Sequence, residues 1–174
     1  MPPIDDHGPY IILLRHAERL DRYMESNGED WIHTASRPQD SPLSPLGEQQ
    51  ATATGKLFSK KYNVTKVLAS PLIRTIQTAH LVCNEFESGP YSICVEQGLT
   101  EESKSLRGKT ADQPRPNWNP LLFSAQELLE YSDRIDVSYE SLVTVRHERD
   151  ESVSNSVREV HDYLTDRDEI TRDR

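Results

Sequence analysis

Apolar and polar positions along the chain form two alternating patterns, short apolar runs and longer stretches with helical spacing. The apolar runs, which are typical of buried strands, cover residues 10–14, 64–69 and 91–95. The helically spaced stretches cover residues 44–61, 70–86 and 153–164. Because strands and helices alternate, the pattern predicts an α/β fold, a three-layer sandwich with a mostly parallel sheet and helices on both faces.

The two central helices carry clear start signals. Ser44 is a favourable N-cap with Pro45 at the first helical position, and Ser70 and Pro71 repeat this arrangement. The positions expected to face the core are Leu46, Ala53 and Leu57 in the first helix, and Leu72, Ile76, Ala79, Cys83 and Phe86 in the second.

The connecting segments are polar and lack a clear period. Residues 21–40 predict a long loop, with a short helix near 20–25. Trp31 within this loop is open to two interpretations, an anchor of the loop or a wall of a substrate site. Irregular structure is expected over residues 98–119, a short helix over 125–131 and an extended piece near 137–139.

Composition limits the class of protein. At 174 residues and 19.9 kDa, residues 1–174 are expected to form a single domain with a real core. The net charge of −9 argues against nucleic acid or an anionic membrane as a partner. Both cysteines, one in an expected helix and one in an expected strand, favour reduced thiols of a cytoplasmic protein. Residues 1–10 lack a signal-peptide pattern, and no apolar run has the length of a membrane span.

Candidate chemistry begins where the first apolar run ends. Arg15 and His16 follow it directly, and ligands of open α/β sheets bind beyond the carboxyl ends of the strands. A neutral imidazole flanked by Arg15 and Arg19 would suit a phosphate, whereas the plain alternative is a charged loop. Two further segments bear on this choice, residues 40–51 and residues 68–79.

Taken in this order, the three segments resemble the patterns of the histidine phosphatase superfamily, also called the phosphoglycerate mutase-like family. These are Arg-His-Gly/Ala-Glu, then Pro-Leu-Ser/Thr-x-x-Gly-x-x-Gln-Ala, then Ser-Pro-x-x-Arg-x-x-Gln-Thr-Ala. The extended form Arg-His-x-Glu-Arg-x-Asp at residues 15–21, followed by Trp31, is most similar to the eukaryotic suppressor of T-cell receptor signalling phosphatases. The resemblance implies the phosphoglycerate mutase-like fold and phosphomonoester hydrolysis.

The resemblance also implies roles for individual residues. His16 would be the nucleophile that forms a phosphohistidine, and nearby arginines would keep it unprotonated. Arg15, Arg19 and Arg74 would bind the phosphate oxygens, with Arg74 in the first turn of its helix.

Acidic residues complete the implied site. Residues 98–101 resemble the family segment Gly-Leu-x-Glu, which makes Glu101 the general acid or base, with Glu102 as the competing assignment. Glu18 would have a structural role that orients an arginine. No cofactor is implied, and no metal site, because the remaining histidines show no ligand spacing with cysteines or carboxylates.

One part of the family pattern has no match. A second essential histidine should follow a late buried strand, but the residues after Leu164 are polar and charged, and neither His147 nor His161 fits. We therefore expect a C-terminally incomplete domain that lacks the last strand or strands, which would leave an open apolar flank on the sheet.

These observations leave three functional readings open. The first is a phosphatase of phosphotyrosine proteins or small phosphorylated metabolites, steroid phosphates included. The alternative is a catalytically impaired module that binds phosphate or a phosphorylated partner, since the second histidine is missing. Phosphoglycerate mutase itself is a weaker third reading, because the chain is short and carries the extended first motif. Domains of this family often pair, so a homodimer is left open.

Overall fold

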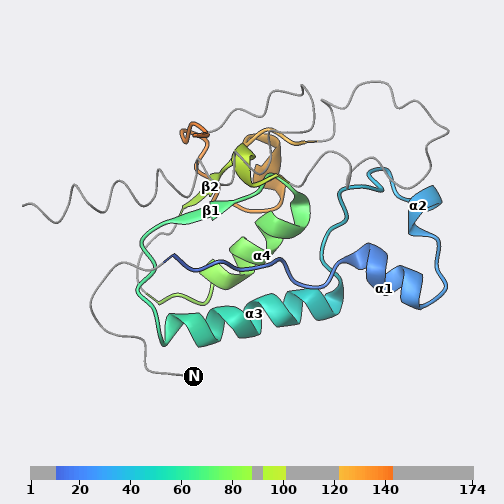
Figure 1. The fold of residues 1–174 in the computed structure, drawn as a ribbon, viewed down its shortest axis with the longest axis horizontal. Coiled ribbons are helices and arrows are strands. Elements are labelled where there is room, and N and C mark those ends of the chain that lie inside the picture. Colours follow the sequence, from blue (N-terminus) through green and yellow to red (C-terminus); the bar gives the residue numbers. More distant parts are fainter. Residues whose placement is uncertain (1–10, 88–91, 101–121, 143–174) are drawn as a thin grey trace, which may run out of the picture.

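A computed structural model describes residues 11–87, 92–100 and 122–142 of the chain. The elements in chain order are helices α1 (Leu20–Ser26), α2 (Trp31–Thr34) and α3 (Pro45–Ser59), strand β1 (Val67–Ala69), helix α4 (Ile73–Cys83), strand β2 (Ile93–Val95) and the 3-10 helices η1 (Gln97–Leu99) and η3 (Glu127–Glu130). Figure 1 shows α3, α4 and the strands stacked over one another, with α1 and α2 to one side.

The sheet is small and parallel. Strands β1 and β2 pair in parallel with Leu68 opposite Cys94, and α4 forms the crossover between them. Helix α4 packs against both strands, and α3 packs against α4. A further parallel bridge joins Ile93 to Ile135. The α/β class with a parallel sheet is therefore confirmed.

The core lies between α4, the two strands and η3. Ile76, Ile93 and Leu128 are completely buried there. Cys83 belongs to the same cluster, and Phe86 packs against it, so the predicted core face of the second helix is confirmed. Both Cys83 and Cys94 are buried free thiols, and burial raises the pKa of Cys83 to about 11.

The predicted face of α3 is wrong, although its start is right. Ser44 caps the helix by accepting a hydrogen bond from the N–H of Gly47. The buried residues are Gly47, Ala51 and Gly55, whereas Leu46 and Leu57 are 48% and 62% exposed. Small side chains let the helix backbone approach its neighbours closely, and the apolar periodicity of the large residues does not report this.

The predicted start of α4 is also wrong. The helix begins at Ile73, with Leu72 as the N-cap, and Ser70 does not cap it. Instead the carboxylate of Asp40, which lies far away in sequence, accepts a hydrogen bond from the N–H of Ile73 at 2.9 Å. A tertiary contact thus replaces the local cap that the Ser-Pro pattern predicts.

The predicted first strand does not form in the described part of the chain. Residues 11–18 have no regular secondary structure, and Leu13 is 92% exposed. A strand needs a hydrogen-bonding neighbour. Among the residues that the structure describes, β1 pairs with β2 and β2 also bridges to Ile135, and no ladder includes residues 11–14.

The connecting segments agree in part with expectation. The short helix predicted near residues 20–25 is α1, and the one predicted over 125–131 is the 3-10 helix η3. The indole N–H of Trp31 donates to the carbonyl oxygen of Pro38 at 3.0 Å, which favours the loop-anchor interpretation. The extended piece predicted near 137–139 is wrong, because residues 137 and 138 form a turn, and the isolated bridge of this region lies at Ile135. The predicted helix over 153–164 lies outside the described residues.

Helix α3 generates a stability prediction. A Cβ atom on Gly55 would lie 2.7 Å from the carbonyl oxygen of Val82, so Gly55→Ala should lower the free energy of unfolding by about 1–3 kcal/mol, despite the better helix propensity of alanine. Leu57→Ala, on the exposed face, should change it by less than about 0.5 kcal/mol. Urea denaturation of both variants measures this, and the opposite ranking would contradict the packing described here.

Candidate active site

Hydrogen bonds bring the three sequence segments to one place. The N–H of Ala17 donates to Oγ1 of Thr78 at 3.2 Å, which joins the first segment to α4. The N–H of Leu43 donates to Oε1 of Gln77 at 2.8 Å, which joins the second segment to the same helix. Both acceptors lie one turn after Arg74. The chain near His16 is therefore fastened beside the first turns of α4.

Glu18 fastens the first segment to α3. Its carboxylate accepts a hydrogen bond from Oγ of Ser44 at 2.5 Å, and its carbonyl oxygen accepts one from the N–H of Ser44 at 3.0 Å. A Cβ atom on Gly47 would lie 2.2 Å from that carbonyl oxygen, so this contact requires glycine. The expected structural role of Glu18 is confirmed, but its described partner is the cap of α3 rather than an arginine.

His16 lies half-buried at the end of the extended segment. Its Nδ1 is 2.8 Å from the carbonyl oxygen of Ala17. A carbonyl oxygen can only accept a hydrogen bond, so Nδ1 carries the proton of the neutral ring. The lone pair of the neutral imidazole is therefore on Nε2.

The surroundings keep His16 neutral. Burial lowers the pKa of His16 below its usual value, and the positive charges of Arg74, Arg15 and Arg19 lower it further. The hydrogen bond to Ala17 acts in the opposite direction and is outweighed. The structure thus brings the three predicted arginines near enough to the predicted histidine to act on its charge.

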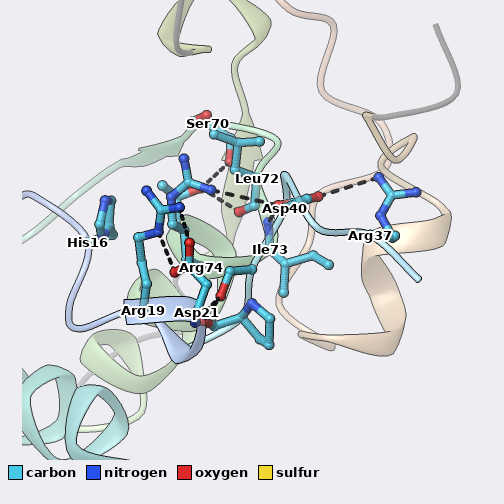
Figure 2. Close-up of polar contacts among 12 residues, drawn as sticks. His16, Arg19, Asp21, Arg37, Asp40, Ser70, Leu72, Ile73 and Arg74 are labelled. Atoms are coloured by element: carbon cyan, nitrogen blue, oxygen red, sulfur yellow. Dashed lines mark hydrogen bonds and ion pairs between the residues drawn. The ribbon is translucent and has the colours of Figure 1, made fainter. Parts of the chain in front are cut away.

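The three arginines differ in how they are held. Arg15 is exposed. Arg19 donates from Nε and Nη2 to the two carboxylate oxygens of Asp21 at 2.9 and 2.5 Å, which fixes the plane of its guanidinium group. Arg74 lies in the first turn of α4, as expected from the sequence, and its side chain is completely buried. Figure 2 shows Arg19 and Arg74 on the same side of Asp40 as His16.

Asp40 is a residue of the candidate site that the sequence did not reveal. Its Oδ1 lies 4.0 Å from Nη1 of Arg74, and its Oδ2 lies 3.4 Å from Nη2 of Arg37. Burial raises the pKa of Asp40, while the hydrogen bond from Ile73 and the two arginines lower it, and burial is the stronger influence. The available signal was an acidic residue at the start of the second segment, two positions before its Pro-Leu-Ser pattern.

Glu96 at the end of β2 was also missed. Its buried carboxylate accepts hydrogen bonds from the hydroxyls of Ser141 at 2.6 Å and Tyr139 at 2.8 Å, and from the N–H groups of Gly98 and Leu142 at 2.9 Å. Burial raises the pKa of Glu96, but these hydrogen bonds outweigh it and the net shift is downward. Glu96 thus stays ionised and holds the segment that leads toward residue 101.

The other predicted site residues lie outside the described part of the chain. These are Glu101, its competitor Glu102, and the unmatched histidines His147 and His161. Across residues 11–87, 92–100 and 122–142, no group of histidines, cysteines and carboxylates could hold a metal ion. In the same ranges, no helix combines the length and apolar character that crossing a membrane requires.

Comparisons with known proteins agree on one family. Residues 11–159 match the sequence profile of the histidine phosphatase superfamily (branch 1). The chain is 29% identical over 157 residues to human ubiquitin-associated and SH3 domain-containing protein A, which covers 74% of this chain and 22% of that protein. It is 26% identical over 140 residues to the mitochondrial serine/threonine-protein phosphatase Pgam5 of Drosophila pseudoobscura pseudoobscura, covering 78% of this chain and 41% of that protein. The chain therefore spans less than half the length of these relatives.

A solved structure has a similar fold. The crystal structure of the ecdysone phosphate phosphatase from Bombix mori in complex with tungstate matches with a TM-score of 0.56 and 22% sequence identity. The match covers 90% of this chain and 56% of that chain. At this identity the likeness supports the fold alone.

The contact between Ala17 and Thr78 generates a first prediction for the site. Thr78→Val keeps the shape of the side chain but leaves the N–H of Ala17 without its acceptor, at a cost of about 1–3 kcal/mol. We expect a lower free energy of unfolding and a shifted His16 ring resonance in NMR spectra. Thr78→Ser keeps the hydroxyl and should restore both, and equal behaviour of the two variants would contradict the role of this hydrogen bond.

The charges around His16 generate a second prediction. An NMR titration should give His16 a pKa below 6.5, so that the ring is neutral at pH 7. Arg19→Gln removes one of the positive charges and should raise this pKa. Arg22→Gln is the matched control, because Arg22 is exposed and paired with Glu25. An unchanged His16 pKa in Arg19→Gln would show that Arg19 does not act on the ring.

Proposed function

Because the chain belongs to the histidine phosphatase superfamily, we propose that it hydrolyses phosphate monoesters through a phosphohistidine formed on His16. The observation that carries this proposal is the tautomer of His16 together with its lowered pKa. Its Nδ1–H is bonded to the carbonyl oxygen of Ala17, and burial together with three arginines lowers its pKa. A neutral ring with its lone pair on Nε2 is what a nucleophilic imidazole requires.

The phosphate would be held by the arginines around the ring. Phosphoryl transfer depends mostly on positioning and on stabilising charge on the equatorial oxygens. Arg19, whose plane is fixed by Asp21, and Arg74, at the start of α4, would donate to these oxygens, and the exposed Arg15 would reach them from solvent. The chain has a net charge of −9, so these groups would form a local positive site in a negative molecule.

The reaction would proceed in two transfers. In the first, Nε2 of His16 bonds to phosphorus while the bond from phosphorus to the ester oxygen breaks, and the leaving oxygen takes a proton from Glu101. In the second, water attacks the phosphohistidine, Glu101 takes a proton from the water, and the bond from phosphorus to Nε2 breaks to release inorganic phosphate. Glu101 holds this role by its match to the family segment.

We further propose phosphotyrosine proteins or small phosphorylated metabolites as substrates. The motif at residues 15–21 supports this class through its similarity to the suppressor of T-cell receptor signalling phosphatases. Two similar proteins, an ecdysone phosphate phosphatase and a serine/threonine-protein phosphatase, are consistent with either a small molecule or a protein as the phosphate carrier.

Hydrolysis of para-nitrophenyl phosphate tests the proposed function. The wild-type chain should release phosphate, and His16→Ala should lose at least about 10³-fold in rate, since removing a nucleophile costs on this scale. His33→Ala is the matched control, because His33 is an exposed histidine paired with Asp30, and its rate should equal that of the wild type.

An alkaline quench tests the phosphohistidine intermediate directly, apart from the effect of His16→Ala on the rate. Incubation with a labelled phosphomonoester followed by alkaline quench should trap label on His16 as an alkali-stable, acid-labile adduct. Undiminished turnover in His16→Ala would overturn the mechanism. Phosphate binding without turnover in the wild-type chain would instead favour the alternative, a module that binds a phosphorylated partner.

A further inference from the structure

Asp40 lies between two arginines that come from different parts of the chain. Figure 2 shows its carboxylate with Arg74 on the side of His16 and Arg37 on the opposite side. The side chain of Asp40 is 2% exposed, and that of Arg74 is completely buried. Charges in such surroundings are weakly screened, so the arrangement of this cluster is set by its internal contacts rather than by solvent.

Each oxygen of the Asp40 carboxylate has a separate contact. Oδ1 accepts the hydrogen bond from the N–H of Ile73 at 2.9 Å and lies 4.0 Å from Nη1 of Arg74. Oδ2 lies 3.4 Å from Nη2 of Arg37. The guanidinium group of Arg37 in turn stacks 3.8 Å from the centre of the Phe123 ring. The N–H of Ile73 and the guanidinium group of Arg37 therefore hold the Asp40 carboxylate in place beside Arg74.

A helix cap would explain only one of these contacts. Ile73 directly precedes Arg74. Oδ1 of Asp40 therefore binds the N–H of Ile73 at the start of α4 and also lies beside the side chain of Arg74. A guanidinium group presents its donors in a rigid plane. A carboxylate beside one edge of that plane attracts this edge and so favours one orientation of the remaining donors.

We propose that Asp40 is a positioning residue, which orients the guanidinium group of Arg74 for a bound phosphate. The inference rests on the proposed function, in which Arg74 binds the transferred phosphoryl group. In this role Asp40 would act through Arg74 rather than by direct contact with the substrate. Arg37 supports it by holding the second carboxylate oxygen.

The direction in which Asp40→Asn changes phosphate binding distinguishes three roles of the carboxylate. Asp40→Asn keeps an oxygen that can accept from the N–H of Ile73, but it removes the negative charge beside Arg74. If the carboxylate orients Arg74, phosphate binding should weaken. If it merely offsets the positive charge of the site, removing it should strengthen the binding of an anion. If it is merely a helix cap, the asparagine should bind phosphate like the wild type.

The experiment measures the dissociation constant of inorganic phosphate by following the His16 ring resonance, together with KM and kcat for para-nitrophenyl phosphate. For Asp40→Asn we expect phosphate affinity to fall about tenfold, on the scale of one hydrogen bond to a charged group. The matched control is Asp30→Asn, since Asp30 is an exposed aspartate that accepts from the N–H of His33 at the start of α2. Its phosphate affinity should not change.

The outcomes separate this inference from the proposed function. Wild-type binding of phosphate without turnover would reject the proposed function, while the affinity of Asp40→Asn would still decide the positioning role. Unchanged or tighter phosphate binding by Asp40→Asn would overturn the positioning role, and so would a wild-type chain that binds no phosphate. If thermal melting shows that Asp40→Asn is unfolded, Arg37→Gln tests the same contact from its far side and should weaken phosphate binding in the same direction.

Discussion

The hydrogen bond from the N–H of Ala17 to Thr78 is the contact on which the candidate site depends. Residues 11–18 have no regular secondary structure, so no described ladder positions His16. Its place is set by this bond to α4 and by the contacts of Glu18 with the start of α3. The histidine is therefore presented by tertiary hydrogen bonds between motif residues. Polar residues of the motifs therefore hold the segments together, in addition to the residues proposed to bind phosphate.

Local patterns predicted most of the element types, although the strand expected at residues 10–14 does not form in the described part of the chain. The α/β class, the starts and ends of β1 and β2 to within a few residues, and the core face of α4 followed from apolar spacing. The face of α3 could not be predicted this way, because its contact surface is made of Gly47, Ala51 and Gly55. Small residues carry little hydrophobic signal, and their value lies in the close approach that they permit to a neighbour absent from the local sequence.

The chemical residues were easier to find than those that hold them. His16, Arg19 and Arg74 stand out because they lie in the segments that resemble the family patterns, and the structure brings the two arginines near enough to lower the pKa of His16. Asp40 and Glu96 did not stand out, since an acidic residue in a polar loop is ordinary in a chain with 29 of them. Their roles appear only when burial and distant partners such as Ser141 are known.

The glycine face of α3 has a consequence for how strain spreads through the molecule. Gly47 lies against the carbonyl oxygen of Glu18 at one end of the helix, and Gly55 lies against the backbone of Val82 further along the same face. Eight residues of helix separate them by about 12 Å, and a helix of this length is stiff. Helix α3 therefore forms a rigid connection between the end of α4 and the segment that carries His16. Crowding at its far contact would tilt the near one, so residues remote from the chemistry share control of its geometry.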